Sequence, residues 1–439
     1  RPFQSQAQTD RNLLDADVRN AGRIVERSTE LKGAFMKLVQ MLSMRNDLLP
    51  PAALEILATV QSSVPPMDAA VIRAQITREL GAPPERLFAA FETEAFAAAS
   101  LGQVHRARLP SGAAVVVKIQ YPGVEETVVQ DLKNIRALIA TLVRIGRDVM
   151  GQKIDATEVA RELEDRLREE LDYVNEAANL TRFRSLFADD PEVVIPEPVP
   201  EFSSRRVLTM HVAEGYPLGD ILAPGVDQEL KDWVAIKYFQ VLWRQIFEFG
   251  ILHTDPHPGN YMVTHHPHLC MLDFGSVLVF EESIRRAYLD LAVSLLADDT
   301  AAMSACFVGL GYLDPGDDPA PMIRILRIVF DDENQRVGRV CVLCTRAVRC
   351  HVICSTVRRA SRVSFGERTI AYERFMEVAQ ISLEHRLFKS PGHRVFLFRA
   401  LIGLESYVQQ LGTVTNWRRV FRECVEHASA PRPARRPKR

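Results

Sequence analysis

The spacing of apolar residues changes twice along the chain and so divides it into predicted parts. Residues 1 to about 85 have apolar positions at helical spacing, as in Leu31 to Met44, interrupted by proline-containing breaks. From Leu87 the spacing becomes mostly that of strands, and beyond Val212 helical spacing predominates again. The pattern predicts an α+β protein with four parts, which are a helical extension (1–85), a strand-rich lobe (86–212), a mainly helical lobe (213–424) and a basic disordered tail (425–439).

A hairpin is predicted behind a loop of small residues. Apolar residues mark strands from Val104 to Leu109 and from Ala113 to Gln120, with the turn-forming Pro110-Ser-Gly112 between them. Small side chains allow backbone N–H groups to approach an anion such as phosphate, although a tightly packed turn would have a similar composition. The candidate phosphate-binding residues in the loop are Ala97, Ala98, Ala99 and Ser100.

Lys118 is the candidate nucleotide-binding lysine of this lobe. It follows three valines on the second strand of the hairpin, and it shares a face with Val116 and Gln120 because side chains alternate along a strand. Such a lysine can contact the α- and β-phosphates of a nucleotide, whereas the alternative is an edge-strand lysine that discourages aggregation. We also assign Met210, in the strand predicted for residues 206–212, to the nucleotide site.

One long helix is predicted over residues 155–183, with its leucines and other apolar residues in a single stripe. At about 100° per residue, Glu170 flanks this stripe, whereas Asp172 and Glu176 share the opposite face. We therefore expect Glu170 to reach inward and pair with Lys118, because a buried lysine without a partner would be costly. The alternative is that all three acids are solvated.

The segment from Phe249 to Gly275 combines two acids and an amide at close spacing. Short apolar runs predict strands at Tyr261–Val263 and Leu269–Leu272, joined by a turn rich in histidine. Asn260 and Asp273 would then lie at neighbouring strand ends and face one pocket.

These residue types suit phosphoryl transfer, which depends on positioning and on charge neutralisation. Asp255 would act as base or orient a water, and Asn260 and Asp273 would supply oxygen ligands for Mg2+. The H-x-D-x-x-x-x-N pattern beginning at His253, followed by Asp-Phe-Gly, matches the protein-kinase signature. An alternative transition-metal site of His253, Asp255 and His257 would leave the amide and the Asp-Phe-Gly motif unexplained.

Composition narrows the functional classes. With 47% apolar residues, 25% charged residues and a net charge of -2 over 439 residues, the chain resembles an ordinary globular protein without a basic field for nucleic acid. We find neither an apolar run of about 18 residues nor the apolar core of a secretory signal. The sequence therefore predicts a cytoplasmic protein whose membrane contact, at the inner membrane surface, is peripheral.

The cysteine content favours a reducing compartment, because seven is an odd number and the chain is long. Four cysteines cluster around His351, but their spacings match no zinc module that we can justify. We interpret them as free thiols and keep a metal site as the alternative. The clustered residues are Cys341, Cys344, Cys350 and Cys354.

Taken in order, the motifs resemble the UbiB, or AarF-domain, family of atypical protein-kinase-like proteins. Lys37-Leu-Val-Gln40 is similar to the K-x-G-Q segment of that family, Ala97 to His105 to its alanine-rich loop, and Glu170-Leu-Asp172 to its E-x-D helix. The lysine strand and the two acid-containing motifs complete a set that spans residues 37–275. Val39 departs from the pattern, because the family has glycine there.

The resemblance implies a two-lobed protein-kinase-like fold that binds ATP and Mg2+ and acts as an ATPase or phosphotransferase in isoprenoid-quinone (ubiquinone-type) biosynthesis. It implies that the helical N-terminal extension packs over the cleft, with Lys37 and Gln40 approaching Asp172 or Glu176. Expected partners are a lipid or quinone precursor and quinone-biosynthesis proteins. Two alternatives are a non-catalytic nucleotide-sensing scaffold and a small-molecule phosphotransferase of the aminoglycoside type, which shares the H-x-D-x-x-x-x-N motif.

Overall fold

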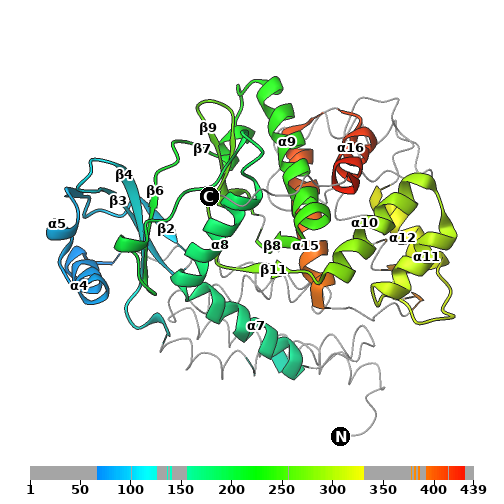
Figure 1. Cartoon of the computed structure of the whole chain (residues 1–439), viewed down its shortest axis with the longest axis horizontal. Coiled ribbons are helices and arrows are strands. Elements are labelled where there is room, and N and C mark those ends of the chain that lie inside the picture. Colours follow the sequence, from blue (N-terminus) through cyan, green and yellow to red (C-terminus); the bar gives the residue numbers. More distant parts are fainter. Residues whose placement is uncertain are drawn as a thin grey trace, which may run out of the picture. The chain divides into compact units, whose positions relative to one another are not determined.

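The computed structural model describes residues 67–99, 101–125, 156–255, 257–330, 392–413 and 415–430, with a few single positions between 136 and 140 and between 377 and 385. It divides into two compact units. The first comprises the chain up to Glu214 together with Cys270–Ser276, and the second comprises Gly215–Leu269 and the chain from Val277 onward. Figure 1 shows the elements of both units.

An antiparallel sheet of five strands forms the framework of the first unit. Lys118 on β4 lies opposite Val104 on β3 and Leu208 on β6. The predicted hairpin and the predicted strand near residue 210 are therefore both confirmed. The sheet runs in the order β1 (Ala90–Phe91), β3 (Gly102–Arg108), β4 (Ala114–Gln120) and β6 (Val207–His211), and β2 (Ala97–Ala99) pairs with β3.

Helix α4 (Ala69–Leu80) packs on this sheet and contributes to its apolar core. The helix begins because the Asp68 carboxylate accepts a hydrogen bond from the Ala70 amide at 2.7 Å, and it ends at Gly81, whose φ of 77° suits glycine. Burying one aliphatic side chain in this core stabilises the fold by about 1.5–3 kcal/mol. The core comprises Ile72, Ile76, Phe88, Leu109, Val115, Val117, Ile119 and Val207, and the short helix α5 (Pro84–Leu87) adjoins it.

Two helices occupy the region in which one long helix was predicted. Helix α7 (Ala156–Glu170) ends before Leu171, and α8 (Tyr173–Leu186) begins after Asp172. Asp172 has an extended backbone (φ -110°, ψ 95°), and its carboxylate accepts hydrogen bonds from the Val174 and Asn175 amides at 3.0 and 3.3 Å. The prediction of a continuous helix was therefore wrong, because Asp172 acts as an N-cap instead of a helix-interior residue.

The strand predicted for residues 193–200 is also shorter than expected. Only β5 (Val193–Val194) is a strand there, and a 3₁₀ turn, η1 (Pro200–Phe202), follows. Pro196, Pro198 and Pro200 lack the amide hydrogen that a sheet requires, which accounts for the interruption.

The second unit is mainly helical, as predicted. Among its described residues the helices are α9 (Gln228–Trp243), continued by a π-helical turn η3 (Arg244–Phe249), then α10 (Glu282–Ala297), α11 (Thr300–Gly309), α12 (Ala320–Phe330), α15 (Gly392–Leu411) and α16 (Trp417–Ser429). Its short elements are β7 (Gly215–Pro217), η2 (Leu218–Leu222), β8 (Ile251–His253), η4 (Pro258–Asn260), β9 (Tyr261–Thr264) and β11 (Val277–Val279). Strand β7 pairs with β9, and β8 pairs with β11. Strand β10 (Leu269–Met271) leads into the segment that belongs to the first unit.

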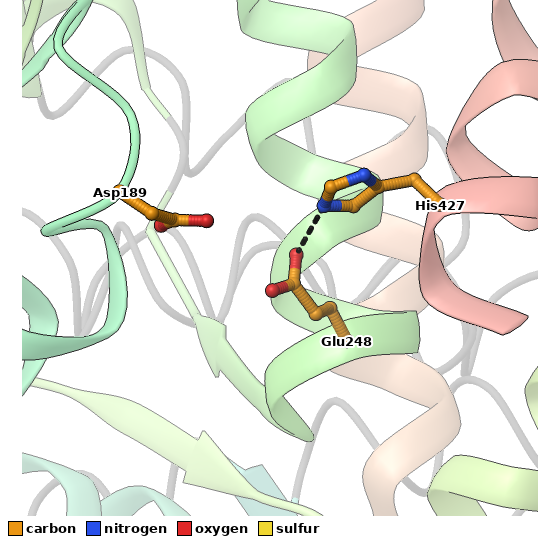
Figure 2. Close-up of side chains that lie close together, drawn as sticks. All are labelled: Asp189, Glu248 and His427. Atoms are coloured by element: carbon orange, nitrogen blue, oxygen red, sulfur yellow. Dashed lines mark ion pairs between the residues drawn. The ribbon is translucent and has the colours of Figure 1, made fainter. Parts of the chain in front are cut away.

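Helix α16 is anchored by aromatic packing. The Phe421 ring lies 4.9 Å from Trp243, and the Trp417 ring lies 5.0 Å from Phe239. Figure 2 shows the ion pair that joins this helix to η3, in which Nε2 of His427 lies 3.6 Å from a carboxylate oxygen of Glu248. Residues 425–429 belong to α16, so the predicted start of the tail at residue 425 was wrong.

Several predictions concern residues outside those that the structure describes. These are the helices of residues 1–66 with Lys37 and Gln40, Ser100, the cysteine cluster from Cys341 to Cys354, and the tail from residue 431. In the part of the chain that is described, no helix combines the length and the apolar character needed to span a membrane.

His105 forms a buried polar connection in the first unit. Its Nδ1 lies 2.8 Å from the carbonyl oxygen of Glu92, and its Nε2 lies 2.8 Å from the side-chain nitrogen of Gln103. Because that nitrogen can only donate, Nε2 accepts and Nδ1 carries the proton, so the ring is neutral. The side-chain oxygen of Gln103 accepts from the Met67 amide at 2.9 Å, which ties β3 to the residue preceding the Asp68 cap of α4.

We predict that acid destabilises the first unit through His105. Burial lowers the pKa of His105, although its bond to Glu92 opposes the shift. The unfolded chain therefore takes up this proton more readily, so stability is complete above the unfolded pKa of about 6.5 and declines as pH falls toward the folded-state pKa. Thermal unfolding followed by circular dichroism should show a larger fall in Tm between pH 7.5 and 5.5 for wild type than for His105→Leu. Parallel pH profiles would contradict this assignment.

Candidate functional site

A buried ion pair between Lys118 and Glu176 lies at the centre of the candidate site. The lysine ammonium donates to the two carboxylate oxygens at 2.8 and 2.9 Å, and the glutamate is only 1% exposed. The same ammonium lies 3.4 Å from Oδ2 of Asp273 and 4.9 Å from the centre of the Tyr173 ring. Two carboxylates and an aromatic face thus surround one positive charge.

The charges in this group shift one another's pKa. Burial alone would lower the pKa of Lys118, but the negative charges of Asp273 and Glu176 hold it well above its ordinary value. Burial raises the pKa of Glu176 to about 7, and Asp273 adds to the shift while Lys118 opposes it. The ammonium therefore stays charged at neutral pH, which a phosphate-binding lysine requires.

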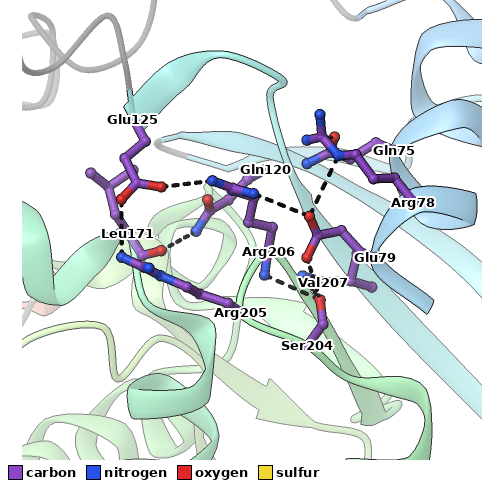
Figure 3. A network of polar contacts seen from close by, with 10 residues as sticks. All are labelled: Gln75, Arg78, Glu79, Gln120, Glu125, Leu171, Ser204, Arg205, Arg206 and Val207. Atoms are coloured by element: carbon purple, nitrogen blue, oxygen red, sulfur yellow. Dashed lines mark hydrogen bonds and ion pairs between the residues drawn. The ribbon is translucent and has the colours of Figure 1, made fainter. Parts of the chain in front are cut away.

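Strand β4 positions both the lysine and the start of α8. Gln120 lies two residues after Lys118, on the same side of the strand, and its side-chain nitrogen donates to the Leu171 carbonyl oxygen at 2.7 Å (Figure 3). The Tyr173 amide donates to the Arg205 carbonyl oxygen at 3.1 Å. These bonds satisfy backbone groups at the break between α7 and α8 and hold α8 where Glu176 reaches Lys118.

A charged network braces the same region from the surface side. Figure 3 shows Arg206 between Glu79 of α4, at 3.3 Å, and Glu125, which follows the turn after β4, at 2.8 Å. Arg205 also contacts Glu125, at 3.0 Å. Because these side chains are partly exposed, we attribute to them alignment of the elements and only a modest stabilisation.

Helix α8 also holds the Asp273-Phe274-Gly275 segment. The Asn179 side chain donates to the Phe274 carbonyl oxygen at 3.0 Å, and the fully buried Phe274 ring lies 4.5 Å from the Phe183 ring. The Gly275 amide donates to Oδ1 of Asp273 at 3.0 Å. One helix thus positions both the partner of the lysine and the turn that carries the second acid.

Two expectations about this helix need correction. We expected Glu170 to pair with Lys118 and Glu176 to face outward, but Glu176 is the buried partner of the lysine. Glu170 ends α7 beside the Asp-Phe-Gly turn, where a β-carbon at Gly275 would lie 3.4 Å from its Cγ. The break at Asp172 changes the direction of every later side chain, so a wheel drawn for a straight helix fails beyond it. Asp172 itself caps α8.

The second unit contains the H-x-D-x-x-x-x-N residues. Asn260 donates its side-chain nitrogen to the Asp255 carbonyl oxygen at 2.9 Å, which leaves its side-chain oxygen as the end suited to a cation. The buried His253 accepts from the Asp255 amide at 3.3 Å, and its own amide donates to Gln245 at 2.8 Å. His253 therefore serves as a framework for the loop that carries Asp255.

The alternative transition-metal site is not formed. Within the described part of the chain, His253, Asp255 and His257 do not bring ligand atoms within 4.8 Å of one another. Nδ1 of His257 accepts from the Gly259 amide at 3.0 Å. Asp255 and Asn260 of the second unit remain as oxygen donors, a carboxylate and an amide, and such donors suit hard cations.

The candidate nucleotide residues of the first unit lie on its sheet. Ala97, Ala98 and Ala99 form strand β2 instead of an open loop. At the start of β3, a β-carbon on Gly102 would lie 2.1 Å from the Ile119 carbonyl oxygen, so only glycine fits. Met210 is buried on β6, opposite Val116 of β4.

Sequence reasoning missed three residues that organise this site, namely Gln120, Tyr173 and Asn179. Asp172 gave the available signal, because aspartate followed by Tyr-Val-Asn favours a helix start over a helix interior. A helix restarted at Tyr173 brings Glu176, Leu180 and Phe183 onto one face.

A lysine on an antiparallel sheet, its glutamate on the adjoining helix and a buried Asp-Phe-Gly phenylalanine define a protein-kinase-like domain. The comparisons agree, because the family model of the ABC1 atypical kinase-like domain matches residues 59–307, more than half of the chain. The chain belongs to this family, which confirms the resemblance found in the sequence.

Relatives and a solved structure extend the comparison. The chain is 40% identical over 306 residues to "Protein ACTIVITY OF BC1 COMPLEX KINASE 3, chloroplastic" of Arabidopsis thaliana, covering 69% of this chain and 42% of the relative. It is 29% identical over 396 residues to "Atypical kinase COQ8B, mitochondrial" of Danio rerio, covering 89% and 59%. The Rv3197–erythromycin complex from Mycobacterium tuberculosis has a TM-score of 0.62 at 23% identity, covering 97% of this chain and 100% of that one, and supports the fold alone. The chain thus spans about half the length of the curated relatives it matches.

We predict that truncating Glu176 destabilises the protein far more than truncating Glu170. Glu176→Ala leaves the Lys118 ammonium without its principal partner in a buried position, which costs about 3–5 kcal/mol, whereas Glu170→Ala costs about 1 kcal/mol or less. Urea denaturation of the two variants gives the comparison. Equal losses would show that the two acids share the ion pair.

Proposed function

We propose that this chain is an ATP- and Mg2+-dependent atypical kinase-like ATPase or phosphotransferase that supports isoprenoid-quinone biosynthesis of the ubiquinone type. The observation that carries the proposal is the charged Lys118 ammonium, held by Glu176 and lying beside Asp273. A lysine so oriented can bind phosphate oxygens without adjusting its own position. The quinone part of the proposal rests on the UbiB resemblance.

In this proposal the first unit binds the nucleotide. Lys118 contacts the α- and β-phosphates, and the Ala97–Ala99 strand with Ser100 supplies the adjacent small-residue surface. Met210 contacts the base. We assign to Glu170, which lies beside Gly275, the role of positioning the Asp-Phe-Gly turn.

The acids and the amide supply the chemistry. Asp255 accepts the proton of the attacking hydroxyl or orients a water, and His253 fixes its backbone. Asn260 presents a side-chain oxygen, and Asp273 presents a carboxylate of which one oxygen is oriented by the Gly275 amide. Bound Mg2+ would neutralise charge that develops on the transferred phosphoryl group.

We also propose that the N-terminal extension regulates access. Lys37 and Gln40 would approach Asp172, whose carboxylate caps α8 at the edge of the site. Glu176 leaves this regulatory set because it pairs with Lys118. The protein would be cytoplasmic and would meet the inner membrane surface peripherally, where a lipid or quinone precursor and quinone-biosynthesis proteins are its partners.

Nucleotide titration tests the cation assignment. In the presence of Mg2+, Asp273→Asn should weaken ATP binding by about 10-fold to 100-fold, because a charged ligand becomes a neutral one. Asp165→Asn is the control, since Asp165 is exposed on α7 and its substitution should leave the affinity unchanged. Equal affinities of wild type and Asp273→Asn would remove Asp273 from the metal site.

ATP hydrolysis, measured with and without anionic vesicles that contain a quinone, tests the activity. Lys118→Met and Asp255→Asn should each lower the rate by about 100-fold or more, because a phosphate contact and the base are lost. Lys37→Ala should raise the basal rate if the extension restricts the site. Nucleotide binding without hydrolysis under any condition would support a sensing scaffold, and phosphorylation of an aminoglycoside would support a small-molecule phosphotransferase.

A further inference from the structure

The Tyr173 hydroxyl is buried without a hydrogen-bond partner. Tyr173 is 2% exposed, and among the described residues no donor or acceptor lies within hydrogen-bonding reach of its oxygen. Buried hydroxyls in proteins are nearly always hydrogen-bonded, because desolvation without a new bond costs free energy. A buried hydroxyl of this kind calls for an explanation, and a ligand that accepts a hydrogen bond is one such explanation.

Tyr173 lies among the charged residues of the candidate site. The Tyr173 ring covers the Lys118 ammonium at 4.9 Å, and the tyrosine interacts electrostatically with Glu176, Asp273 and Glu170. Burial raises the pKa of Tyr173, and the three acids raise it further while Lys118 opposes the shift, so the phenol remains protonated and can donate.

Packing alone does not require this hydroxyl. The contact with Lys118 is made by the face of the ring, which phenylalanine would supply as well. The backbone amide of Tyr173, which donates to Arg205, would also be unaffected by such a change. Phenylalanine would fulfil both structural roles without burying an unpaired oxygen.

We propose that the Tyr173 hydroxyl donates a hydrogen bond to a phosphate oxygen of the bound nucleotide, beside the phosphate contact of Lys118. The inference rests on the proposed nucleotide site and adds a neutral donor to it. A phosphate held by Lys118 lies next to the covering ring, and its oxygens are strong acceptors. Tyr173 is in this sense a binding residue, and it leaves the proton transfer to Asp255.

Tyr173→Phe tests the proposal, with Tyr312→Phe as the matched control. Tyr312 is also buried, but its hydroxyl lies 2.9 Å from that of Tyr288 in the second unit. Calorimetric titration with ATP, with ADP and with adenosine gives the affinities of wild type and both variants, and thermal unfolding without nucleotide gives their Tm. We expect Tyr173→Phe to weaken ATP and ADP binding by about 10-fold to 100-fold, to leave adenosine binding unchanged, and to keep or raise the Tm.

The control should behave in the opposite way. Tyr312→Phe removes the hydrogen bond between the two hydroxyls, so its Tm should fall while its nucleotide affinities match those of wild type. If wild type binds ATP and Tyr173→Phe binds it equally well, the inference is overturned and the nucleotide site stands. If Tyr173→Phe has a lower Tm with unchanged affinity, the hydroxyl has a structural role. If wild type binds no nucleotide, the proposed function fails together with this inference.

Discussion

The burial of the Lys118 charge is the constraint on which the first unit depends. An ammonium removed from water needs a carboxylate close by. Strand β4, which carries Lys118, has no acidic residue. The acid comes from α8, and it reaches the lysine only because the chain breaks at Asp172 and restarts. Gln120 holds that break from the same strand. Lys118 and Gln120, the residue that holds the helix break, are thus only two positions apart on one strand.

Much of the fold could be predicted because its signals are local. Alternating apolar residues gave the β3–β4 hairpin, and helical spacing gave most helices of the second unit, to within a few residues. The fold class and the family were confirmed. The order of the lysine, H-x-D-x-x-x-x-N and Asp-Phe-Gly motifs predicted the family, because each motif is contiguous in sequence.

The errors arose where a cap or a distant contact overrides periodicity. At Asp172 one carboxylate interrupts an otherwise regular apolar stripe and reverses the assignment of Glu170 and Glu176. The tail was predicted to begin at residue 425, but residues 425–429 belong to α16, in which Trp417 and Phe421 pack on aromatic rings of α9 that lie far away in the sequence. Intrinsic helix propensity depends on local sequence alone, so the secondary structure of these segments is set by packing against distant residues.

Helix α8 couples the two halves of the site within the first unit. Tyr173, Glu176, Asn179 and Phe183 recur at spacings of three and four residues, so they share one face of the helix. The first two residues contact the lysine, and the last two hold Phe274 through a hydrogen bond and a ring contact. A displacement of α8 would therefore move the partner of Lys118 and the support of Asp273 together. In the proposed function, a phosphate bound at Lys118 and a cation bound at Asp273 would therefore favour the same position of α8, and each would strengthen the binding of the other.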